Sequence, residues 1–196
     1  MIVLWAPLRL LSALNTFLLL IGRNLAWVCL AAMVCSILAQ VFFRYVVGNA
    51  LPWSEELARF LMLWMTGLIA PSAFRWGGFV AIDMVPMAMP RVPGLILNLF
   101  ILFASLLVLS VGVRLGWGEI TGFGGRFNSP SLKIPLALIG GENIVVKKAW
   151  MMASLFVFCV LAVLVNIELI LRNLISILDE DAELPRDRHT IAAGSD

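Results

Sequence analysis

The stretch FFRYVVGNALPWSEELARF, residues 42–60, contains two arginines, two glutamates, a Gly-Asn pair and a Pro-Trp pair. The chain on both sides of it is almost wholly apolar. Pro52 suits the first turn of a helix, where its missing N–H costs no hydrogen bond. Ser54 is a residue type that caps free helix amides. We therefore predict that this stretch forms the turn that connects one helix to the next at a polar surface.

The charges of this turn fit the predicted hairpin. Glu55 and Glu56 fall in the first turn of the second helix, where the helix dipole favours anions. Arg59 follows them by four and three residues, so it can pair with either glutamate. Arg44 ends the first helix and is expected to reach Glu56 across the turn, while Trp53 suits the level of the lipid headgroups. Stabilisation of the hairpin and docking of a partner remain equal alternatives for this patch.

Composition decides the class of protein. Of the 196 residues, 62% are hydrophobic and 13% are charged, whereas soluble domains carry about 25% charged residues. A water-soluble fold of this length cannot hide so much apolar surface, so we predict an all-α integral membrane protein. The net charge of +2 gives no field that would favour nucleic acid. The three cysteines lie in apolar runs and are expected to be buried, inert thiols.

Four apolar runs approach or exceed the ~20 residues that a helix needs to cross the hydrocarbon core. We predict spans at about 20–43, 57–74, 92–113 and 147–170 within a single membrane domain, residues 1–178. An amphipathic interfacial helix is expected to precede the first span up to about Leu14, the alternative being a long first helix. A segment of the third loop, 134–141, is expected to lie at the interface, and residues 179–196 form a polar, disordered tail.

Charged and metal-binding side chains are scarce within the predicted spans. The only histidine, His189, lies in the tail, so a haem-binding anchor lacks its usual axial ligands. No charged residue falls near the middle of a predicted span, which argues against a carrier that works alone. Glu168 bounds the fourth span and is expected to pair with Arg172, while Arg75 and Arg91 are expected to face headgroups. We predict no enzyme, metal site or cofactor in this chain.

Several motifs together resemble the small, Q-type membrane subunit of tripartite ATP-independent periplasmic (TRAP) transporters. The family pattern is an Arg-Tyr pair, Trp-Ser-Glu-Glu, an arginine, a Gly-Gly pair and an aspartate. Its counterparts here are Arg44, Tyr45, Trp53, Ser54, Glu55, Glu56, Arg75, Gly77, Gly78 and Asp83. A later Ser-Pro-x-Leu-x-x-Pro segment lies at 129–135, and the resemblance covers about residues 15–175. Phe79 replaces a frequent histidine, and the third loop is longer than usual.

This resemblance implies a scaffold in a bacterial inner-membrane transporter for organic acids. A large membrane subunit would carry the sodium and substrate sites and move against this chain, and a periplasmic binding protein would deliver the substrate. Both termini would be cytoplasmic, although seven basic residues on each side leave the positive-inside rule undecided. The motif residues, together with Arg59, are the candidates for subunit contacts. The alternative is a membrane anchor of an electron-transfer enzyme.

Overall fold

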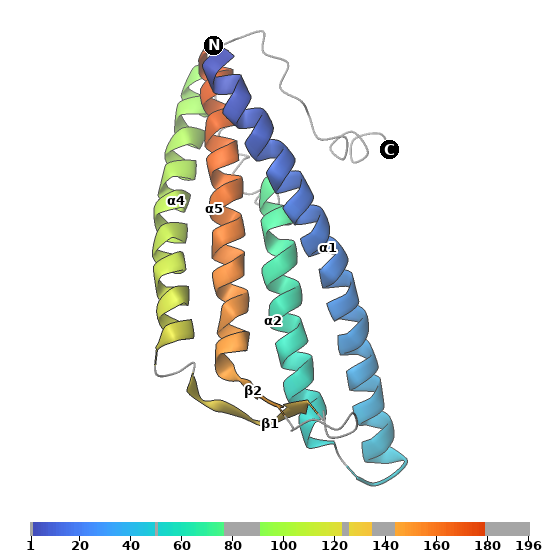
Figure 1. Ribbon diagram of the computed structural model, residues 1–196. Coiled ribbons are helices and arrows are strands. Elements are labelled where there is room, and N and C mark those ends of the chain that lie inside the picture. Colours follow the sequence, from blue (N-terminus) through green and yellow to red (C-terminus); the bar gives the residue numbers. More distant parts are fainter. Residues whose placement is uncertain (1, 50, 77–90, 123–125, 135–143, 179–196) are drawn as a thin grey trace, which may run out of the picture.

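Four long helices dominate the fold (Figure 1), which is a computed structural model that describes residues 2–49, 51–76, 91–122, 126–134 and 144–178. The helices are α1 (Ile2–Tyr45), α2 (Pro52–Arg75), α4 (Arg91–Thr121) and α5 (Lys148–Leu178). Each is long and apolar enough to cross a membrane. The prediction of an all-α protein with four membrane helices is therefore confirmed, although α1, α4 and α5 run several residues beyond the expected spans.

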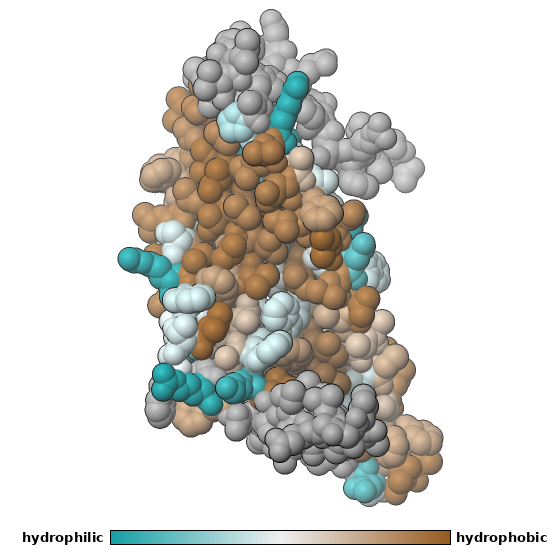
Figure 2. All heavy atoms as spheres, in the orientation of Figure 1, coloured by the Kyte–Doolittle hydropathy of each residue, from teal (hydrophilic) through white to brown (hydrophobic). Residues whose placement is uncertain are grey.

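The helices form an open row and not a closed bundle. In Figure 1 the order across the molecule is α4, α5, α2 and α1. α5 packs against each of the other three helices, and α1 packs along α2. Within the described part of the chain, α4 has no contact of similar extent with α1 or α2. Apolar side chains cover most of the face shown in Figure 2, as expected of a surface in contact with lipid.

The expected interfacial helix before the first span is absent, because α1 is one continuous helix of 44 residues. At 1.5 Å per residue it is about 66 Å long, more than twice the ~30 Å hydrocarbon core. Asn15 is buried against α5, and Leu19 is buried as well. Asn15 therefore packs inside the protein, whereas Arg9 remains exposed.

The third loop contains structure that the sequence did not predict. Strands β1 (Asn128–Ile134) and β2 (Ile144–Lys147) pair in an antiparallel ribbon. The ribbon lies beneath the beginning of α2 (Figure 1), which β1 contacts. The expected interfacial segment, 134–141, falls almost entirely outside the described residues, as does the tail from 179 to 196.

Close helix contacts depend on small residues. A Cβ atom added to Gly67 of α2 would stand 2.8 Å from the backbone oxygen of Ser154 in α5. Only glycine allows the two backbones to approach this closely. Nearby, Trp64 Nε1 of α2 donates a hydrogen bond to the carbonyl of Trp150 in α5, at 3.1 Å. Together these contacts hold α2 and α5 side by side with their chains running in the same direction.

Candidate functional site

The predicted hairpin lies at one end of the row, but its contacts are mostly local. The guanidinium of Arg44 stacks 5.9 Å from the ring centroid of Tyr45, at the exposed end of α1. Glu55 and Arg59 form an exposed i,i+4 ion pair, as predicted. Trp53 is also exposed. Exposed pairs of this kind add little to stability, so these side chains are available to other molecules.

Ser54 does not cap α2. The N-cap residue is Leu51, which makes no side-chain cap, and Pro52 follows it in the first turn. The Ser54 hydroxyl donates to the Leu51 carbonyl at 2.8 Å, and the Ser54 carbonyl accepts from the Ser36 hydroxyl at 3.2 Å. Ser54 is fully buried between α1 and α2. It therefore joins the two helices of the hairpin and does not satisfy the free amides at the helix end.

The strongest polar site lies at the other end of α2, around Glu168 of α5. The Glu168 side chain has 0% of its surface exposed, and Arg75 of α2 has 5%. Arg75 Nη2 donates to Glu168 Oε1 at 2.9 Å. Arg172, one turn farther along α5, donates to the same oxygen from Nη2 at 2.6 Å and from Nε at 3.0 Å. Two guanidiniums from two helices thus share one buried carboxylate oxygen.

Helix α1 completes this site with three polar side chains. Asn15 Nδ2 donates to Glu168 Oε2 at 2.7 Å and to the Leu164 carbonyl at 3.1 Å. Arg75 Nη1 donates to the Thr16 hydroxyl at 2.8 Å. The Ser12 hydroxyl accepts from Arg75 Nη2 at 3.1 Å, and Arg172 Nη2 lies 3.3 Å from the same oxygen. We call these six residues the Glu168 cluster: Ser12, Asn15, Thr16, Arg75, Glu168 and Arg172.

The Glu168 cluster corrects two predictions. Arg75 does not face headgroups, because its side chain is buried against α1 and α5. The predicted pair between Glu168 and Arg172 is present, but it is part of a larger network. Glu168 also lies within α5 and not at its end, since ten residues of the helix follow it. The expectation that Glu168 bounds the fourth span is therefore wrong, because the apolar helix continues beyond it.

Electrostatics explain why the cluster is built in this way. A charge inside a membrane helix is costly unless it faces the protein interior and meets partners. Hydrogen bonds that involve ions are short and about twice as strong as neutral ones. Removal of one partner from such a buried pair leaves the other charge uncompensated, at a cost of ~3–5 kcal/mol. The cluster thus makes the positions of α1, α2 and α5 depend on one another.

On the α4 side, α5 carries two buried amides. Asn173 Nδ2 donates to the Leu95 carbonyl of α4 at 3.2 Å. Asn166 is fully buried, and neither polar atom of its side chain has a hydrogen-bond partner in the described part of the chain. A buried amide without partners is unfavourable, so Asn166 is a weak point in the packing of α4 on α5.

Three motif candidates, Gly77, Gly78 and Asp83, lie outside the described residues. Among the residues that the structure does describe, no group of three His, Cys, Asp or Glu side chains could hold a metal ion. The Glu168 cluster contains no nucleophile beside a base. Its chemistry is that of a structural network, which holds helices together through ionic hydrogen bonds.

Comparison with known families supplies the identity. The model of the family described as tripartite ATP-independent periplasmic transporters, DctQ component, matches residues 33–175, which is well over half of the chain. A comparison with curated proteins found no match. The matched region covers α2, α4, nearly all of α5 and the last part of α1, so it includes Arg75, Glu168 and Arg172 but not the partners from α1. The chain belongs to the DctQ-component family, the small membrane subunits of TRAP transporters.

Proposed function

We propose that this chain is the fixed scaffold of a sodium-coupled TRAP transporter for organic acids. A large membrane subunit binds sodium and the carboxylate substrate and moves against the scaffold. A periplasmic binding protein delivers the substrate to this assembly. Family membership supports the presence of both partners in general terms, and this chain itself contributes no substrate, sodium or cofactor site in the proposal.

The observation that carries the scaffold role is the Glu168 cluster. An elevator-type subunit moves as a body and needs a neighbour that does not deform. Helices α1, α2 and α5 are joined at the cluster by hydrogen bonds to one carboxylate. A shift of any of these helices along another would separate a buried charge from its partners, at a cost of several kcal/mol. Such a network favours one fixed arrangement of the helices.

The proposal includes an orientation in the bacterial inner membrane. Both termini face the cytoplasm, so the hairpin end with Arg44, Tyr45 and Trp53 faces the periplasm. The exposed pair of Glu55 and Arg59 lies at the same end. In this arrangement the hairpin end helps to receive the binding protein.

Reconstitution tests the proposed function. The chain, its large subunit and its binding protein are placed in proteoliposomes, and uptake of labelled carboxylates is measured with and without an inward sodium gradient. We expect uptake that requires sodium and all three proteins. Uptake that persists without this chain would contradict the scaffold role. A purified chain that carries a haem absorbance band and binds a redox enzyme would favour the anchor function instead.

A further inference from the structure

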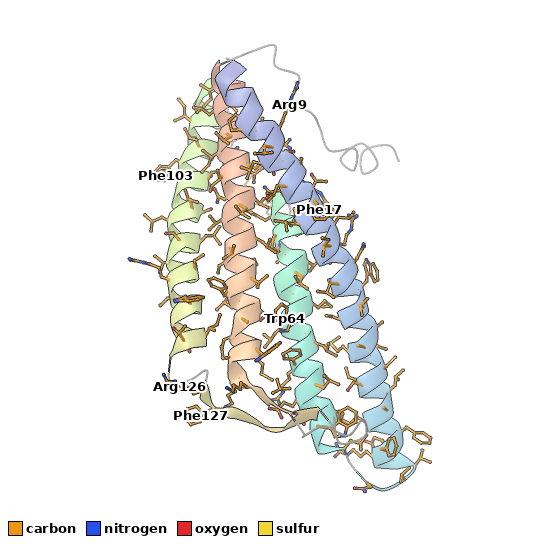
Figure 3. All side chains as sticks on the ribbon, viewed as in Figure 1. Arg9, Phe17, Trp64, Phe103, Arg126 and Phe127 are labelled. Carbon is orange, nitrogen blue, oxygen red and sulfur yellow. The ribbon has the colours of Figure 1, made fainter. Side chains whose placement is uncertain are left out.

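Three basic residues meet where the β1–β2 ribbon joins α5. The Phe127 carbonyl accepts a hydrogen bond from the Lys148 N–H at 2.9 Å, and Asn128 of β1 pairs with Lys147 of β2. Arg126 precedes Phe127 in the chain, so its backbone lies beside the same bond. We call Arg126, Lys147 and Lys148 the basic junction. Figure 2 shows hydrophilic side chains at this place, where α4 ends and α5 begins, and Figure 3 labels Arg126 there.

The charges of the basic junction have no counter-charge within the described part of the chain. All three side chains are exposed, and none of them forms a hydrogen bond or an ion pair there. Glu119, near the end of α4, is also exposed and pairs with none of them. Arg59 at the hairpin end differs, because it is paired with Glu55. Like charges that are held close together repel, so an anion placed between them would be stabilised.

The basic junction is set back from the tip of the hairpin. Helices α2 and α5 run side by side, and Gly67 of α2 lies against Ser154 of α5. Gly67 is fifteen residues from the start of α2, whereas Ser154 is only six residues from the start of α5. At 1.5 Å per residue, α5 therefore begins about 14 Å behind the start of α2. The junction thus lies at the level where α4 and α5 end, and not at the protruding tip.

Exposed indole rings lie next to the basic junction, on its side toward the middle of the helices. Trp150 follows Lys148 by two residues, and Trp117 lies four residues before the end of α4. Both rings are exposed. The Trp117 ring also contacts Phe156 of α5, with 5.6 Å between the ring centroids. Indoles favour the boundary between hydrocarbon and headgroups, so these two rings place the junction at the level of lipid phosphates.

We propose that the basic junction binds the phosphate of an anionic phospholipid, whose acyl chains lie along Trp117 and Trp150. A guanidinium such as that of Arg126 can donate to two phosphate oxygens at once, while lysine ammonium groups supply compact point charges. An acidic protein surface would also match three basic side chains. The exposed indoles and the distance from the hairpin tip favour the lipid. This inference is independent of the proposed function, because it concerns the chain and its membrane alone.

Native mass spectrometry of the purified full chain tests the site. The chain in neutral detergent is titrated with dioleoylphosphatidylglycerol, and separately with dioleoylphosphatidylcholine, which has the same acyl chains but no net charge. The measured quantity is the fraction of chain that carries one lipid. We expect tighter binding of phosphatidylglycerol, and an excess of inorganic phosphate should not displace it, because the acyl chains contribute to binding.

Substitution of the basic residues locates the binding. Arg126→Gln and Lys147→Gln should each lower the affinity for phosphatidylglycerol roughly fivefold, and the double variant roughly 25-fold, with no change for phosphatidylcholine. Arg9→Gln is the matched control, since Arg9 is an exposed arginine at the other end of the molecule (Figure 3). The melting temperature without added lipid should be the same in all variants, because these side chains have no partner in the described ranges.

Four results would overturn the lipid site. Equal affinities for the two lipids, or an affinity for phosphatidylglycerol that survives the double substitution, would remove its basis. An equal loss with Arg9→Gln would show attraction by overall charge and no local site. Displacement by inorganic phosphate would show that the junction holds a free anion. Binding of the cognate binding protein that requires the junction, without any lipid preference, would assign it to an acidic protein surface. The proposed function would stand in each case.

Discussion

Replacement of Glu168 by glutamine is the sharpest perturbation of the scaffold. Glutamine has nearly the same shape, so it leaves no cavity. It removes the negative charge between Arg75 and Arg172. It also replaces one accepting oxygen with an NH2 group. This donor would then face another donor, either a guanidinium or the Asn15 amide. The substitution therefore tests the ionic network and not the packing of α5.

The contacts of Glu168 set the size of the effect. The carboxylate accepts from three guanidinium nitrogens and one amide nitrogen, and each bond to a charged group contributes ~1.5–3 kcal/mol. Such terms are not additive, and removal of one partner from a buried pair costs ~3–5 kcal/mol in total. The Arg172 side chain is 18% exposed, so water can solvate part of its charge when the carboxylate is removed. For a domain of this size, ~3–5 kcal/mol lowers the melting temperature by roughly 6–20 °C.

A buried thiol provides the assay. Cys159 is buried at the contact of α5 with α4, so a thiol-reactive fluorophore labels it only after unfolding. Cys35 is exposed and Cys29 is half-buried, which corrects the expectation that all three thiols are buried. Both are replaced by serine, and melting is followed in detergent. Glu55→Gln is the matched control, because it breaks the exposed pair with Arg59, worth ~0.5 kcal/mol at most. Equal melting temperatures for Glu168→Gln and Glu55→Gln would refute the reasoning that the cluster holds the helices together.

The other predictions concern the same melting temperature. Gly67→Ala is expected to lower the melting temperature, because the new methyl group would lie 2.8 Å from an α5 carbonyl oxygen. Gly118→Ala is the control, since it adds a methyl group in open space and should leave the melting temperature unchanged or raise it. An unchanged melting temperature for Gly67→Ala would contradict the close contact. Asn166→Leu should raise the melting temperature, because it removes a buried amide without partners in the described ranges. Asn173→Leu should lower the melting temperature, because it removes the hydrogen bond to α4. A lower melting temperature for Asn166→Leu would reveal a buried water bound to that amide. Trp64→Phe should cost ~0.5–1.5 kcal/mol through loss of its bond to α5, and an unchanged value would show that packing alone positions the ring.

The number of membrane helices was predictable because it depends on simple physical requirements. A backbone in lipid must satisfy its own hydrogen bonds, so each long apolar run can only become a helix. The charged stretch at residues 42–60 marked the turn between the first two. Neither inference needs any knowledge of tertiary contacts, which explains why both hold in the structure.

The Glu168 cluster was not predictable by the same reasoning. A charge was taken as the end of a span, but α5 continues for ten residues beyond Glu168. A signal was available, since the chain stays largely apolar from Leu169 to Leu178 and the only charge there, Arg172, lies one turn from Glu168. The contributions of Asn15 and Arg75 could not be inferred, because the three helices meet only in the tertiary structure.

The turn of α2 shows how a local motif can mislead. Pro52 and Ser54 together matched the pattern of a capped helix, and the helix does begin at Pro52. Yet Ser54 faces α1, where burial between two helices decides its hydrogen bonds. The β1–β2 ribbon was missed for a related reason, because pairing of two short segments separated by a loop has no strong local signal.

The buried arginines of this chain show how charge can be placed between membrane helices. Arg75 and Arg172 are both paired with Glu168 within the chain, so the cost of burying these charges is offset by contacts that the chain makes itself. Arg114 is exposed and lies seven residues before the end of α4, where a long side chain can reach the headgroups. The two kinds of arginine should therefore respond differently to substitution: loss of Glu168 weakens the contacts among α1, α2 and α5, whereas loss of the Arg114 charge leaves these contacts unchanged.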